Sequence, residues 1–345
     1  MDARPTPEQR ELQDAADRLA AKLGPNSVGD LDDADRRHRL DAAIAQAGWR
    51  ELRTGTSTES LASGFEAAIV SRALARRCCD TAYIGPVLAH DLLRRAGHNG
   101  DGVARCIAVS GDLSRIATTD TASLSDAGLA IDVAGATAAL LVVSTERREF
   151  IVAEAPLPIA TTGVDLTRPV AALAVDTKVN VIGGAVALEA DDLTAWTALA
   201  VALSAADLVG VMEGALELSC EYAKQRHQYG AAIGSYQALQ HLLAEAKTLT
   251  EGAASATIYA AWAVDALSPT EARAAAAVAK AYATRAARTV CETAIQVHGG
   301  IGNTWECMAH VYLRRALLST ELFGDDGPQL ALLGQQRWGA TNGLS

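Results

Sequence analysis

The sequence predicts an α+β protein built from a helical N-terminal domain, a small middle β-domain and a C-terminal four-helix bundle. Half of the 345 residues are apolar but only 4% are aromatic, so alanine-rich helices supply most of the candidate core. A chain of this length is suited to two or three domains that share surfaces. We place these domains at 1–101, 102–190 and 191–345.

The first hundred residues have the periodicity of helices. A Thr6 cap, Pro7 at the first helical position and Gln9 three residues after the cap form a helix start. Apolar residues then recur at helical spacing until a Gly-Pro pair ends the pattern. Further helices are expected over about 34–47, 59–78 and 86–96.

From about Cys106 to Leu188 the pattern changes to short segments rich in Val, Ile and Leu, which is typical of strands. No helical segment lies between them, so a parallel βαβ sheet is disfavoured. Neither GxGxxG nor GxxxxGK occurs there, so a Rossmann or P-loop site is not predicted. The strands are expected near 106–109, 129–133, 138–143, 149–152 and 170–175.

From about Leu193 onward the helical period returns and persists, and small residues lie on several helix faces, as in a bundle. The longest charge-free apolar run, 193–206, is too short to cross a bilayer, so no membrane partner is expected. Long helices are expected over about 235–267, 270–297 and 304–320.

The charge and the cysteine content limit which partners, metals and compartments we expect for this protein. The net charge of -11 and the pI of about 5.1 argue against binding to nucleic acid. None of the six cysteines forms a CxxC pair, so no metal is expected, and Cys78 and Cys79 read as small buried hydrophobes. No signal peptide is apparent, and we expect reduced thiols in the cytoplasm.

Two motifs in the last third of the chain carry the functional signal. The first begins Arg226-His-Gln-Tyr-Gly and continues to His241, and the second runs from Gln296 to Glu306. A guanidinium beside an amide donor makes a good clamp for a pyrophosphate. The paired glycines of the second motif let a cofactor approach backbone N–H groups.

Together these motifs closely resemble the signatures of the acyl-CoA dehydrogenase family, and Asp165-Leu-Thr-Arg168 resembles its motif late in the β-domain. The resemblance implies FAD bound across a dimer interface, where one subunit holds the adenosine and pyrophosphate end and the reactive ring lies mainly in its neighbour. Carried over residue by residue, the implied cofactor-binding residues are Arg226, Gln228, Tyr229, Gln237, Gln296, Gly299 and Gly300.

The family's catalytic base has no counterpart here. Its reaction removes a proton alpha to the thioester, so it needs a carboxylate at a defined place. In most members a Glu precedes a Gly one helix after the Gly-Gly motif, and an ungapped count puts Phe323 there. In other members the base lies on the long helix before the Arg motif, where the count lands near Ala200. We therefore predict no catalytic residue in this chain.

The β-domain also departs from the family pattern. Active members resemble Thr-Glu-Pro-x-Ala-Gly-Ser-Asp, then Lys and Trp-Ile-Thr, where this chain has only Ala108-Val-Ser-Gly-Asp-Leu-Ser-Arg115. The chain thus keeps the residues for the pyrophosphate end of FAD but lacks the base and the motif that holds the ring. In this combination it resembles a subunit of the two-subunit acyl-CoA dehydrogenases of steroid catabolism, which act on sterol side-chain CoA thioesters. That resemblance implies an α2β2 heterotetramer in which this chain completes the FAD site of a catalytic partner that holds the acyl-CoA.

Two alternatives remain open. The chain could be a self-sufficient acyl-CoA dehydrogenase with a displaced base, Glu321 being the first candidate, or a flavin-free acyl-CoA-binding scaffold. A shift of two residues on a helix turns a side chain through more than half a turn. We therefore expect Glu321, Asp325 and Asp326 to be solvated helix-end charges.

Overall fold

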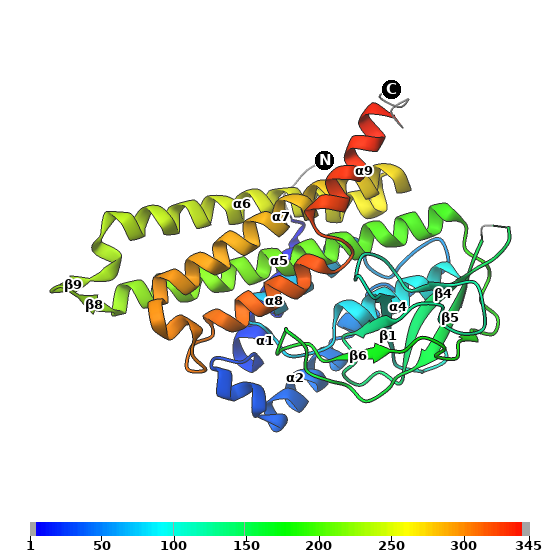
Figure 1. Ribbon diagram of the computed structural model, residues 1–345, viewed down its shortest axis with the longest axis horizontal. Helices are drawn as coiled ribbons and strands as arrows, with labels where there is room; N and C mark the ends of the chain where they lie inside the picture. Colours follow the sequence, from blue (N-terminus) through cyan, green and yellow to red (C-terminus); the bar gives the residue numbers. More distant parts are fainter. Residues whose placement is uncertain (1–4, 99, 148, 340–345) are drawn as a thin grey trace.

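The computed structural model describes residues 5–98, 100–147 and 149–339. The molecule is elongated, with three long helices running side by side along its length and a β-sheet beside one half of them (Figure 1). The long helices are α5 (Ala190–Gln225), α6 (Gln237–Ala266) and α7 (Pro269–His298). Of the shorter N-terminal helices, the first two lie under the middle of the bundle in this view and the fourth lies against the sheet.

The N-terminal helices begin where local capping dictates. Thr6 and Gln9 form the predicted capping box, with the Thr6 hydroxyl accepting from Gln9 N at 3.2 Å. Ser63 and Glu66 form another, so the helix predicted from residue 59 starts at residue 64. These helices are α1 (Pro7–Leu23), α2 (Ala34–Gln46), α3 (Gly64–Arg76) and α4 (Ile84–Arg95), with 3-10 turns η1 (Val28–Asp32) and η2 (Trp49–Glu51).

The sheet is mixed and covered on both faces. Its order is β6-β3-β1-β4-β5-β7, with β2 also paired to β4; β1 and β2 run parallel to β4 and the other pairs are antiparallel. Along β1, Ile107 and Val109 face the helices while Cys106 and Ala108 face a smaller core. The strands are β1 (Arg105–Ser110), β2 (Thr118–Thr119), β3 (Gly128–Ile131), β4 (Ala138–Ser144), β5 (Phe150–Pro156), β6 (Val170–Leu173) and β7 (Asn180–Val181).

Helix α5 is the centre of the bundle. It is long and apolar enough to cross a membrane by length and composition, but 94% of its most apolar window is buried inside the fold, as in a core helix. A hairpin of β8 (His227–Gln228) and β9 (Ala231–Ala232) and the turn η3 (Ile233–Ser235) lead to α6. After α7 come η4 (Gly299–Asn303), α8 (Ala309–Glu321) and α9 (Asp326–Trp338), so the helix predicted from residue 304 starts five residues later.

A buried cluster of charges joins the β-domain to the bundle. Asp207 of α5 accepts from Arg315 of α8 at 2.6 Å and from the Ser319 hydroxyl at 2.6 Å. Arg168 pairs with Asp165 at 2.8 Å and lies 3.6 Å from Asp207. Burial alone would raise the pKa of Asp207, but the two guanidinium groups lower it to about 2. The Asp-Leu-Thr-Arg motif therefore anchors the β-domain on α5 and α8.

Replacing Arg315 with Met should destabilise the protein by about 3 kcal/mol, because breaking a buried ion pair leaves a charge without its partner. Urea unfolding at neutral pH measures this loss. The matched control is Arg288→Met, which removes an exposed pair with Glu292 and should cost less than about 1 kcal/mol. Equal losses in the two variants would contradict the anchoring role.

Candidate functional site

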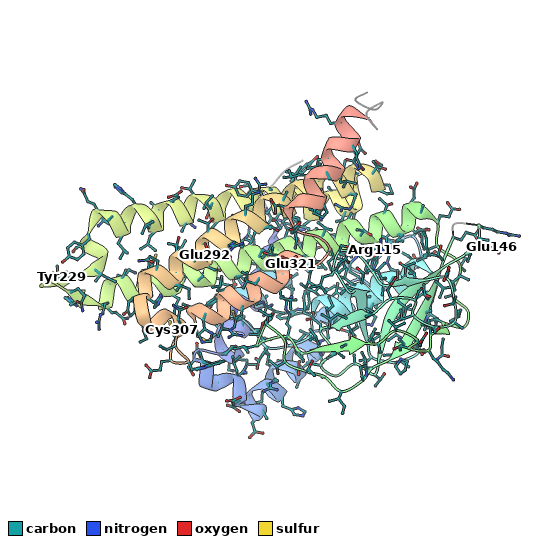
Figure 2. The ribbon with its side chains drawn as sticks, in the orientation of Figure 1. Arg115, Glu146, Tyr229, Glu292, Cys307 and Glu321 are labelled. Carbon is teal, nitrogen blue, oxygen red and sulfur yellow. The ribbon has the colours of Figure 1, made fainter. Side chains whose placement is uncertain are left out.

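The structure brings the seven sequence-predicted cofactor residues to one end of the bundle. Figure 2 shows Tyr229 at this extreme of the molecule and Glu321 towards its middle. The ring of Tyr222, near the end of α5, stacks on His298 at the end of α7 with 4.4 Å between ring centroids. This contact holds the two motifs together. All seven residues are exposed in the single chain, namely Arg226, Gln228, Tyr229, Gln237, Gln296, Gly299 and Gly300.

A two-residue hairpin turn fixes the first motif. His227 pairs with Ala232 and Gln228 with Ala231, which leaves Tyr229 and Gly230 as the turn. Both have positive φ, 52° and 82°, as the mirror-image turns of tight hairpins require. Glycine adopts this backbone freely, whereas tyrosine does so at a cost. Tyr229 is nonetheless 95% exposed, so the strain holds an aromatic ring out in solvent.

The cationic and amide groups of this end are available to a ligand. Within the described chain, Arg226 takes part in no ion pair, so its fork of donors is free to hold phosphate oxygens. Gln228 and Gln296 are exposed as well. A side chain added at Gly299 or Gly300 would meet no atom within 4 Å, so the space beside both backbones is open. These groups fit a pyrophosphate.

His298 belongs to the packing beneath this end. It is 6% exposed, and its Nδ1–H donates to the carbonyl of Ala294 at 2.7 Å. Burial lowers the pKa of its imidazole, which favours the neutral ring that stacks on Tyr222. Its role is to fix the end of α7.

A second region, between the β-domain and the bundle, holds Phe323, the residue that the ungapped count puts at the position of the family's usual base. Its ring is 2% exposed and lies edge-on to Trp196 of α5 at 6.0 Å. The Trp196 indole N–H donates to Leu88 O of α4 at 2.9 Å. Ala200, the other counted position, is also fully buried, one turn further along α5.

The backbone closes this region as well. Phe323 N donates to Leu113 O at 2.7 Å, which ties the loop after α8 to the turn after β1. That turn is the shortened segment where the family's ring-holding motif is expected. In this turn Asp112 accepts hydrogen bonds from the hydroxyl groups of Ser110 and Ser114, so the turn is held by its own side chains. Side chains and backbone therefore fill the space around Phe323.

The nearby acids lie at helix ends. Glu321 is exposed at the last position of α8. Asp325 caps α9 by accepting from Gly327 N at 2.9 Å, and Asp326 pairs with Arg285 at 2.5 Å. Among the residues described, no group of three or more His, Cys, Asp and Glu side chains is placed to hold a metal ion.

Sequence reasoning missed Lys280, a fully buried amine on α7. Its Nζ donates to Ser204 Oγ at 2.6 Å and also to the carbonyl of Ser319. Burial lowers the pKa of Lys280 to about 7, although nearby Asp207 acts to raise it. The available signal was a lone charge inside an alanine-rich, otherwise apolar helical segment.

The C-terminal part of the chain is similar to a known protein family. Residues 197–337 match the family described as Acyl-CoA dehydrogenase, C-terminal domain. The C-terminal part of the chain belongs to the acyl-CoA dehydrogenase family. The acyl-CoA dehydrogenase IpdE2 of Mycobacterium tuberculosis is 40% identical over 136 residues, which are 39% of this chain and 41% of that protein. The aligned part therefore spans less than half of the relative's length.

Solved structures extend the likeness to the whole fold. The ChsE4-ChsE5 complex from Mycobacterium tuberculosis has a TM-score of 0.82 at 23% identity, covering 97% of this chain and 98% of that one. A variant of the Tcur3481-Tcur3483 steroid acyl-CoA dehydrogenase has a TM-score of 0.78 at 20% identity, covering 95% and 97%. PigA with FAD and proline has a TM-score of 0.77 at 17% identity, covering 98% and 100%. The chain has the acyl-CoA dehydrogenase fold.

Lys280 gives stability a defined pH dependence. Its folded pKa of about 7 lies below the ordinary 10.5, so between these values the unfolded chain binds one proton more than the folded chain. Stability should therefore rise with pH across that window. The free energy of unfolding of Lys280→Met minus that of wild type should therefore be roughly a few kcal/mol larger at pH 7 than near pH 10.

Urea unfolding of both proteins at several pH values in this window measures the difference. Lys247→Met removes an exposed lysine of α6 and serves as the control with a nearly pH-independent effect. If the difference between Lys280→Met and wild type does not change with pH, the amine is not titrating as described.

Proposed function

We propose that this chain is a subunit of a flavin-dependent acyl-CoA dehydrogenase that supplies the adenosine and pyrophosphate half of an FAD site. The ring half and the catalytic carboxylate would come from a different, catalytic subunit. The observation that carries this proposal is the contrast between an open, exposed phosphate clamp at Arg226 and a filled region at Phe323.

The length of α5 supports action on a neighbouring subunit. The filled region begins at Trp196 and the clamp at Arg226, 30 residues later on the same helix (226 minus 196). At 1.5 Å per residue they are about 45 Å apart, farther than one dinucleotide cofactor reaches. A flavin held by this clamp therefore has its ring outside the Phe323 region of the same chain.

The exposed hairpin supports an interface at the clamp. Tyr229 keeps a strained backbone although its side chain is 95% exposed in the described chain, and a second molecule that covers the ring would account for this strain. When bound, FAD supplies the acceptor for the hydride of the desaturation. This chain's part is to bind its phosphates through Arg226 and through the open backbone at Gly299 and Gly300.

The partner, substrate and compartment are inferred by likeness. The similar structures ChsE4-ChsE5 and Tcur3481-Tcur3483 are each named for a pair of proteins, and the second is described as a steroid acyl-CoA dehydrogenase. PigA, another similar structure, was solved with FAD. We infer an α2β2 assembly that desaturates an acyl-CoA at the alpha and beta carbons, with steroid side-chain thioesters as the specific candidates in lipid catabolism. The six free cysteines are compatible with the cytoplasm.

Co-expression with an acyl-CoA dehydrogenase subunit from the same genome that keeps the catalytic Glu tests the proposal. The purified complex should hold one flavin for every two subunits, measured by flavin absorbance against protein concentration. The chain purified alone should be colourless. A lone chain that binds stoichiometric flavin and oxidises an acyl-CoA would overturn the proposal.

Arg226→Ala should weaken FAD binding by the complex at least about tenfold, because it removes a charge-assisted phosphate contact. Flavin retained after dialysis reports the loss, and Arg288→Ala, an exposed cation on α7, is the matched control. Glu321→Gln should leave turnover unchanged. Turnover abolished by Glu321→Gln would instead favour the self-sufficient enzyme with a displaced base.

A further inference from the structure

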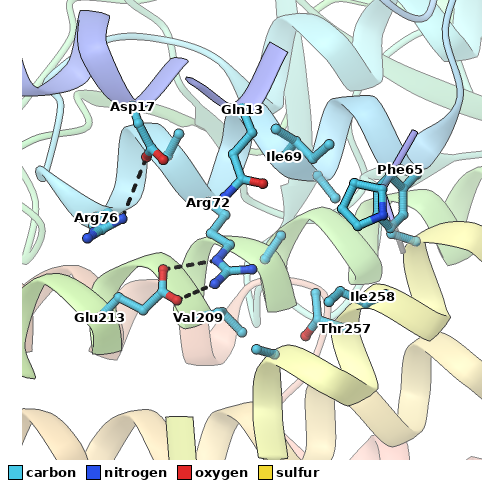
Figure 3. Close-up of a pocket in the computed structure, with 16 residues that line it drawn as sticks. Gln13, Asp17, Phe65, Ile69, Arg72, Arg76, Val209, Glu213, Thr257 and Ile258 are labelled. Carbon is cyan, nitrogen blue, oxygen red and sulfur yellow. Dashed lines mark hydrogen bonds and ion pairs between the residues drawn. The ribbon is translucent and has the colours of Figure 1, made fainter. Parts of the chain in front are cut away.

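A small cavity lies where the N-terminal helices meet the bundle, on the α1 and α6 side of α5 (Figure 3). Its volume is about 80 Å³, and helices α1, α3, α5 and α6 all contribute to its walls. The cavity stays open because alanines line it at positions where larger side chains would fill the space. These alanines are Ala68, Ala73, Ala206, Ala254 and Ala261.

Two polar groups of the cavity lining have no hydrogen-bond partner among the described residues, the hydroxyl of Thr257 and the Nε of Arg76. Thr257 of α6 is 5% exposed. Threonines in helices usually donate to the carbonyl four residues earlier, as Thr250 does to Ala246 at 2.8 Å. The unpaired Thr257 hydroxyl offers a ligand oxygen the hydrogen bond that buried hydroxyls normally have.

The charges around the cavity balance, although the Nε of Arg76 makes no hydrogen bond among the described residues. Arg72 donates to Glu213 through two nitrogens, one at 2.9 Å, and Arg76 lies 3.8 Å from Asp17 (Figure 3). Two cations thus face two anions, and an ionised ligand would find no uncompensated charge to bind. Desolvating such a ligand against alanine and Val209 is unfavourable. The lining therefore selects against ions.

We propose that this cavity binds a small uncharged amphiphile, with an apolar body over the alanines and one carbonyl or hydroxyl oxygen on Thr257. An apolar protein cavity of about 150 Å³ holds benzene, so this smaller, partly open one suits about four or five heavy atoms. The site involves neither the Arg226 end nor the Phe323 region, and it stands independently of the flavin proposal.

Two isosteric probes test the inference on the full-length chain. Butanone and 2-methylbut-1-ene have the same shape, but only butanone carries an oxygen. Ile69 and Ile258 line the cavity, so their labelled methyl resonances report occupancy by NMR. We expect saturable shifts with butanone, and binding of butanoate at least about tenfold weaker because its charge must be desolvated.

Thr257→Val keeps the shape and removes the hydroxyl. It should weaken butanone binding at least about fivefold, since a lost hydrogen bond costs this much in affinity, and leave 2-methylbut-1-ene within about twofold. Thr250→Val, on the same helix but outside the cavity, is the matched control and should change neither. Absence of a saturable butanone shift in wild type would overturn the proposal, as would equal loss of both probes in Thr257→Val.

Discussion

The buried charge cluster around Asp207 is the constraint on which the rest of the structure depends. It pairs a carboxylate of the central helix with guanidinium groups from the end of the β-domain and from α8. Such a cluster is stable only when each charge keeps its partners, so it admits one relative placement of these three elements. That placement fixes α8, and α8 fixes Phe323.

The closed region follows from this placement. With α8 held against Thr167 and Arg168, the loop after it meets the turn after β1, and Phe323 N donates to Leu113 O. The aromatic ring then packs on Trp196, which is itself held to α4. The opposite end of α5 has no such contacts and presents the exposed clamp. One helix thus separates a filled region from an open one, and this contrast is the physical basis on which we propose a supporting role for the chain.

Local signals predicted much of the fold. The capping box at Thr6 and the run of small residues in the bundle gave helices where the structure has them, and five predicted strands are present. Strands β2 and β7 have two residues each, too few to produce a period. The start of α3 was predicted too early because Ser63 and Glu66, rather than the apolar spacing, set it.

Only part of the candidate site could be predicted from the sequence. The two motifs name residues that the fold brings to one end, but the stacking of Tyr222 on His298 that joins them depends on distant segments. The burial of Lys280 and the bond between Leu113 and Phe323 are likewise long-range. Sequence counting placed Phe323 and Ala200 at the two expected positions of a base, but it could not predict that both residues are buried in packed surroundings.

The most direct measurement is an experimental structure of the flavin-loaded complex with the catalytic subunit. Our account predicts that the pyrophosphate of each flavin contacts Arg226 and that no flavin ring lies beside Phe323 of this chain. A flavin ring bound between the turn at Leu113 and Phe323, within proton-transfer distance of an acid of the same chain, would contradict it.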